Sequence, residues 1–142
     1  MRETSNDLAM EKEILDAVCF KWHCGWRKLG NGGKYRVDAV LQEGPEIRAW
    51  VEVKDYSSPK FIGMNIPKYM EGVALAKVTG CTFMLLIRVA GRIGYIRLHD
   101  GLDTLAPPKF IVTGGTPAGK TPLPDDIEPM AMFDQTVVRW MD

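Results

Sequence analysis

Residues 35–56 of the chain read YRVDAVLQEGPEIRAWVEVKDY, and this stretch predicts both the fold and the position of its chemistry. Two runs rich in valine, isoleucine and aromatic residues, Tyr35–Leu41 and Ile47–Lys54, flank the turn-forming pair Gly44-Pro45. Strand-forming runs separated by a short turn sequence are typical of a β-hairpin. We therefore expect two antiparallel strands here, with acidic residues at positions where a strand often carries apolar ones.

The register of this hairpin decides which side chains meet. A turn centred on Gly44-Pro45 sets Asp38 opposite Val51 and within one residue of Glu52. A β-bulge would bring the two carboxylates level. Because side chains alternate along a strand, Lys54 lies on the same face as Glu52. Two carboxylates and a lysine are therefore expected to converge on one patch.

Two nearby carboxylates repel each other, and a hard divalent cation such as Mg²⁺ relieves that repulsion. Mn²⁺ is the expected substitute for Mg²⁺. A lysine beside the ion can favour an ionised water or neutralise charge that builds up on a phosphate. The competing interpretation is that Asp38, Glu52 and Lys54 are solvated surface charges, as most charged residues are.

The pattern of Asp38 followed, across a hairpin, by Glu52-Val53-Lys54 resembles the signature of the PD-(D/E)xK nuclease superfamily. This superfamily includes restriction endonucleases, archaeal-type Holliday junction resolvases and many phage nucleases. The proline that precedes the family's aspartate is Val37 here. The resemblance implies a Mg²⁺-dependent hydrolase of DNA phosphodiester bonds. Asp38, Glu52 and the Val53 carbonyl would bind the metal, and Lys54 would activate or orient the attacking water.

The elements around the hairpin predict the same fold. Apolar periodicity indicates helices at Asp7–His23 and Ile66–Thr79 and strands at the other segments named below. Asn6 or Asp7 is expected to cap the first helix. In chain order the elements are Asp7–His23, Gly25–Leu29, the hairpin, Ile66–Thr79, Cys81–Val89 and Arg92–Leu98. This order is similar to the αβββαβ core of the superfamily, an α/β, restriction-endonuclease-like fold with a central mixed sheet flanked by helices.

Further site residues are expected outside the hairpin. In similar nucleases the first helix supplies another acidic residue, and Glu13, at the edge of the apolar stripe, is the first candidate. Glu11 and Asp16 are less central alternatives. The second helix of such nucleases often presents a lysine to the site. The residues expected to contact nucleic acid are Lys60, Lys68 and Lys120.

Residues 114–121, GGTPAGKT, match the phosphate-loop pattern G-x-x-x-x-G-K-[ST] after an expected strand, Lys109–Thr113. A phosphate loop must open a helix, and Pro122 and Pro124 leave no apolar period for one. We therefore interpret this stretch as a surface loop, followed by an acidic loop, residues 125–129. Residues 133–140 are expected to end the chain as a strand or short helix.

The chain of 142 residues has a formal net charge of zero, so any surface that binds nucleic acid must be local. We expect a single nuclease-like domain, residues 1–142, with a core at about 7–98 and a C-terminal extension at 99–142. The absence of membrane-length apolar runs and the three cysteines favour the cytoplasm of a bacterium or phage-infected cell.

The expected partner is DNA, and the resemblance to small junction-resolving or phage-type nucleases adds a homodimer as a hypothesis. Two alternatives stay open. One is a nuclease-like module that binds nucleic acid or protein without cutting, and the other is a nucleotide binder that uses Lys120.

Overall fold

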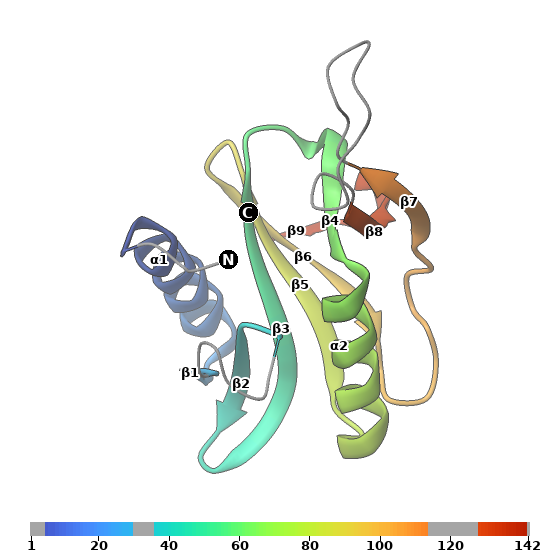
Figure 1. Cartoon of the computed structure of the whole chain (residues 1–142). Coiled ribbons are helices and arrows are strands. Elements are labelled where there is room, and N and C mark those ends of the chain that lie inside the picture. Colours follow the sequence, from blue (N-terminus) through green and yellow to red (C-terminus); the bar gives the residue numbers. More distant parts are fainter. Residues whose placement is uncertain (1–4, 30–35, 114–127, 142) are drawn as a thin grey trace, which may run out of the picture.

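The longest strand of the protein, β3 (Glu46–Tyr56), runs through the middle of a six-stranded sheet (Figure 1). The computed structural model describes residues 5–29, 36–113 and 128–141. The pairing of β3 is antiparallel with β2 and parallel with β5, so the sheet is mixed, as predicted. In spatial order the sheet contains β1 (Gly25–Lys28), β2 (Ala39–Glu43), β3, β5 (Thr82–Val89), β6 (Arg92–His99) and β9 (Arg139–Trp140).

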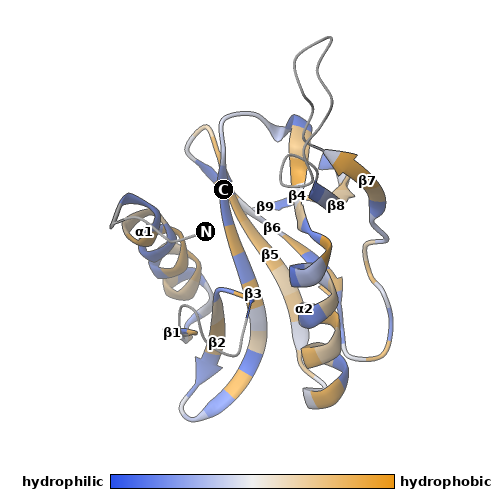
Figure 2. Cartoon of the chain, in the orientation of Figure 1, coloured by the Kyte–Doolittle hydropathy of each residue, from blue (hydrophilic) through white to orange (hydrophobic). Residues whose placement is uncertain are grey.

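Two helices cover opposite faces of this sheet (Figure 1). Helix α1 (Ser5–Trp22) packs on the face to which β3 contributes Val51 and Val53, whereas α2 (Ile66–Thr79) lies on the Trp50 face. Blue bands interrupt the apolar colour along β3 but hardly along β5 (Figure 2). A strand covered on both faces usually has a continuous apolar sequence. Strand β5 follows this rule, whereas charged residues interrupt the apolar sequence of β3. Neither described helix is long and apolar enough to cross a membrane.

Helix α2 has the predicted boundaries, and its ends show why. Asn65 caps the helix, because its side chain accepts a hydrogen bond from the backbone N–H of Lys68. Gly80 adopts the left-handed conformation (φ 70°) that ends a helix. The expected cap of α1 was wrong: Asn6 and Asp7 lie inside this helix, where an acidic side chain in the first turn is favoured by the helix dipole.

A second, three-stranded sheet stands beside α2 in Figure 1, in the order β4, β8, β7. Its strands are β4 (Ile62–Asn65), β7 (Lys109–Thr113) and β8 (Glu128–Phe133). The strand expected at Lys109–Thr113 is confirmed. The phosphate-loop-like residues 114–121, with Lys120, lie outside the described residues.

Strands occupy part of the expected acidic loop and a segment after β3 for which we predicted no strand. After β3, residues 59–61 form a short 3₁₀ helix and β4 follows, whereas Glu128 and Pro129 open β8. The strand β4 is buried on both faces at three successive positions, so no alternation marks it in the sequence. The C-terminal residues form a 3₁₀ turn, Gln135–Val137, and then β9.

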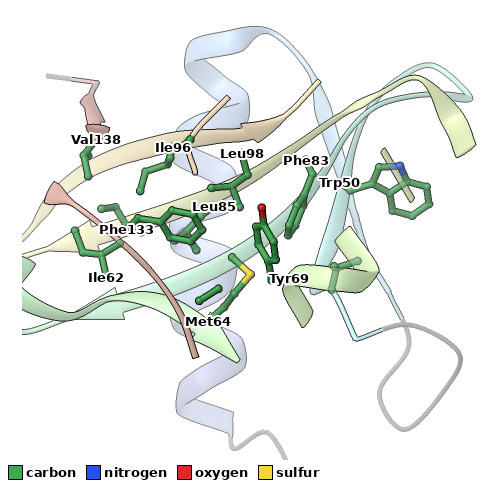
Figure 3. Close-up of a cluster of buried hydrophobic side chains, with 14 of the residues drawn as sticks. Trp50, Ile62, Met64, Tyr69, Phe83, Leu85, Ile96, Leu98, Phe133 and Val138 are labelled. Atoms are coloured by element: carbon green, nitrogen blue, oxygen red, sulfur yellow. The ribbon is translucent and has the colours of Figure 1, made fainter. Parts of the chain in front are cut away.

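The core between the main sheet, α2 and the small sheet is rich in aromatic rings (Figure 3). Tyr69 of α2 lies with its ring centre 6.5 Å from that of Phe83 on β5 and 6.0 Å from that of Phe133 on β8. Beneath Phe83, α2 carries Gly72, at which an added Cβ would lie 2.1 Å from the Phe83 ring. The glycine therefore lets α2 approach the sheet.

We predict that Gly72→Ala lowers the free energy of unfolding by about 1–3 kcal/mol, because overpacking at a buried contact outweighs the better helix propensity of alanine. Urea denaturation measures this difference. Gly25→Ala is the matched control, since its added Cβ meets only ordinary van der Waals contacts. A Gly72→Ala protein as stable as the wild type would contradict this account of how α2 packs.

Candidate active site

A β-bulge in the hairpin shifts the register of the two strands beside the signature carboxylates. Glu43 pairs with Glu46 beside the turn, but the register shifts between Leu41 and Gln42, so that Ala39 pairs with Val51. The regular pairing of the two strands ends at Ala39, one residue before Asp38. A register shift of the kind considered from the sequence is therefore present, and Asp38 lies beside residues 51–53 of β3.

Asp38 is held in place by the backbone of β3. Its backbone N–H donates to the Val51 carbonyl (3.1 Å), and its side-chain Oδ2 accepts a hydrogen bond from the Val53 N–H (2.9 Å). The Asp38 carboxylate is thus oriented by two successive contacts with the strand that carries Glu52. Its other oxygen, Oδ1, faces the ammonium of Lys28, 3.7 Å away.

Glu52 is a fully buried acid, with 0% of its surface exposed, and Asp38 beside it is 8% exposed. Burial, and then the neighbouring Asp38 charge, raises the pKa of Glu52 to about 8. Two lysines oppose this shift: Lys68 Nζ lies 2.9 Å and Lys54 Nζ 3.8 Å from Glu52 Oε2. Burial and the Asp38 charge outweigh both lysines.

Lys68 and Glu52 form an ion pair. Neither oxygen of Glu52 accepts a hydrogen bond from the residues that the structure describes. Two buried acceptors without a donor are costly in an apolar interior. Buried carboxylate oxygens that lack a donor and lie next to a second carboxylate are suited to bind a hard divalent cation.

The structure brings Glu11, and not Glu13, to this cluster. Glu11 of α1 is 5% exposed and both its oxygens accept from Lys28 Nζ, at 2.9 and 3.3 Å. Glu13 instead pairs with Arg88 (2.8 Å), which also holds Asp55 (3.1 Å). Residues two positions apart on a helix point in different directions, so only one of the two glutamates can face Asp38.

Asp16, the other alternative on α1, is exposed and accepts hydrogen bonds from Lys12 and Trp26. A signal for Glu11 was present in the sequence, because residues 11, 14, 15 and 18 form one buried helical stripe. A carboxylate on such a stripe needs a polar partner. Lys28, which provides it from β1, carried no signal beyond its place on a short strand.

Helix α2 also positions the chain just before Asp38. One oxygen of Glu71 accepts hydrogen bonds from the backbone N–H groups of Arg36 and Val37, the latter at 3.1 Å. The same helix therefore carries Lys68 to Glu52 and holds the chain that leads to Asp38.

Lys60 lies on the 3₁₀ helix after β3, with its ammonium 5.6 Å from the centre of the exposed Phe61 ring.

In the part of the chain that the structure describes, no three His, Cys, Asp or Glu side chains gather closely enough to hold an ion by themselves. The cluster instead has two adjacent carboxylates, with Glu11 joined to them through Lys28. Such a pair is sufficient for Mg²⁺, which keeps several waters and often takes only one or two carboxylates from a protein. The donor set therefore fits a magnesium-type ion.

An αβββαβ core with a mixed sheet, and a bulged hairpin that sets Asp38 beside Glu52-Val53-Lys54, define a nuclease of the PD-(D/E)xK superfamily with a restriction-endonuclease-like fold. Residues 1–139 match the family described as "Phage putative PDDEXK endonuclease". The chain belongs to this phage PDDEXK endonuclease family.

A solved structure with a similar fold is that of Hjc, a Holliday junction resolvase from Archaeoglobus fulgidus. The TM-score is 0.52 at 14% sequence identity, and the similarity covers 63% of this chain and 75% of Hjc. No protein with a curated description matches the chain. The predicted fold class and superfamily are thus confirmed.

The raised pKa of Glu52 makes the stability of the metal-free protein depend on pH. The folded state holds the Glu52 proton up to pH about 8, whereas the unfolded chain releases it near 4.5. The contribution of protonated Glu52 to the free energy of unfolding is therefore fully present below pH 4.5 and is lost as the pH rises through about 8. We predict that Glu52→Gln removes this decline, as measured by urea unfolding in EDTA across this pH range.

The control is Glu46→Gln, which changes an exposed carboxylate on the same strand and should keep the wild-type pH dependence. Identical pH profiles for the wild type and Glu52→Gln would contradict the burial of an ionisable Glu52.

Proposed function

We propose that the chain is a divalent-metal-dependent endonuclease that hydrolyses phosphodiester bonds of DNA at the Asp38–Glu52 pair. One observation carries this proposal: the carboxylates of Asp38 and Glu52 are both buried and interact, and the two oxygens of Glu52 receive no hydrogen bond from the described residues. A module that only binds DNA or protein has no need of this costly arrangement. Mg²⁺ is the proposed ion and Mn²⁺ its substitute.

Asp38, Glu52 and the Val53 carbonyl are the proposed metal ligands. Glu11 replaces Glu13 as the proposed carboxylate of the first helix, because it contacts the ammonium that faces Asp38. A bound divalent ion would polarise the phosphate and lower the pKa of a water molecule. Hydrolysis then adds this water at phosphorus and breaks one P–O bond, which leaves a phosphate end and a hydroxyl end.

Lys54 and Lys68 supply the positive charge of this site. Both ammonium groups lie within 4 Å of Glu52 Oε2, and both side chains are partly exposed. Lys54 would orient the attacking water and stabilise the negative charge that grows on the phosphate oxygens. Lys68 stands at the N-terminus of α2, where the helix dipole also favours an anion.

The test is cleavage of labelled plasmid, linear duplex, single-stranded and four-way-junction DNA with Mg²⁺, Mn²⁺ or EDTA. We predict metal-dependent cutting that falls by on the order of 100-fold or more in both Asp38→Asn and Lys54→Met. Lys12→Met is the matched control, because Lys12 pairs with Asp16 on the exposed side of α1. Cutting that survives in Asp38→Asn, or that proceeds in EDTA, would contradict the proposed site.

The four-way junction is included because Hjc is a Holliday junction resolvase. We propose branched or phage DNA as the substrate and a homodimer as the active assembly, since two sites would meet two strands. Lys60, and Lys120 beyond the described residues, are proposed contacts for the DNA backbone. Equal cutting of all four substrates would argue against a preference for branched DNA.

A further inference from the structure

We propose that the Lys28 ammonium is a resident counter-ion of the active site, and that a divalent ion displaces it from Asp38 when it binds. This inference rests on the proposed metal site and concerns what occupies the carboxylates before the metal arrives. Lys28 is the one lysine among the described ion pairs that joins the α1 carboxylate to the signature aspartate.

The geometry gives Lys28 the place that an ion would need at Asp38. Oδ2 of Asp38 accepts a hydrogen bond from the Val53 N–H, whereas Oδ1 is the oxygen that faces Lys28. The Lys28 ammonium lies 3.7 Å from that oxygen. An ion coordinated by Oδ1 and a second cation facing the same atom repel each other strongly in a buried site.

The charges of the cluster lead to the same conclusion. When all three carboxylates are ionised, Glu11, Asp38 and Glu52 are matched by three lysines, Lys28, Lys54 and Lys68, and the formal charges cancel. A divalent ion would leave the cluster with an excess of two positive charges. Moving one lysine outward removes half of that excess.

Lys28 is the lysine that faces Asp38, and its position allows this movement. It extends from β1, the edge strand of the main sheet, and its side chain is 26% exposed. A long side chain at such an edge can keep its stem in place while its ammonium turns to solvent or to a substrate phosphate. Its contact with Asp38, at 3.7 Å, is longer than its contact with Glu11, at 2.9 Å.

Lys28 therefore has two opposing effects on the protein. Without metal, its ammonium stabilises the folded state by separating two buried carboxylates. With metal, the same charge competes with the ion and weakens its binding. Lys28→Met removes the charge while keeping the apolar stem, so it should destabilise the metal-free protein and tighten metal binding.

The experiment is isothermal titration of Mn²⁺ into the wild type, Lys28→Met, Lys28→Arg and Lys12→Met without DNA. We expect Lys28→Met to lower the Kd for Mn²⁺ by on the order of tenfold. Lys28→Arg keeps a cation and should retain the wild-type Kd, and so should the control Lys12→Met. In urea unfolding, Mn²⁺ should stabilise Lys28→Met more than it stabilises the wild type, whereas in EDTA the variant should be the less stable protein.

An unchanged or higher Kd in Lys28→Met would overturn the proposal while leaving the metal site intact, provided that Asp38→Asn still abolishes Mn²⁺ binding. Absence of Mn²⁺ binding in every variant would overturn the metal site and this inference together. If Lys28→Met does not fold, Lys28→Gln replaces it, since it also lacks the charge and keeps a polar end for Glu11.

Discussion

The close burial of two carboxylates, Asp38 and Glu52, is the constraint on which the rest of the structure depends. Two anions in contact repel each other, and burial strengthens that repulsion because little water remains to screen it. One result is visible in the pKa of Glu52, which rises to about 8. The fold must hold these side chains together while supplying enough positive charge to make their burial tolerable.

The required contacts come from elements that are distant in the sequence. The bulge in the hairpin sets the register, and the Val53 N–H fixes the orientation of Asp38. Helix α2 brings Lys68 to Glu52, and β1 brings Lys28 to Asp38. Helices α1 and α2 lie on opposite faces of the sheet (Figure 1), and each contributes one side chain to the cluster, Glu11 and Lys68 respectively.

Local chemistry in the sequence predicted the hairpin and α2, because a turn pair, a proline and a glycine mark their ends, and the hairpin register predicted that Asp38 and Glu52 lie close together. The spacing of residues 11, 14, 15 and 18 on one face of α1 favoured Glu11 over Glu13, and we did not use this signal. Lys28 was missed for a different reason: only the antiparallel pairing of β1 with β2 carries it to Asp38. The strand β4 was not predicted because it is buried on both faces, so its sequence shows no alternation of apolar and polar residues.

The central claim is that Asp38 and Glu52 together hold a divalent ion. The most direct test is a crystal structure of the protein with Mn²⁺, in which anomalous scattering locates the ion without reference to activity. The account predicts an ion at about 2.1 Å from carboxylate oxygens of both Asp38 and Glu52, with the Lys28 ammonium withdrawn from Asp38. An ion bound elsewhere, or no ion at saturating Mn²⁺, would contradict it.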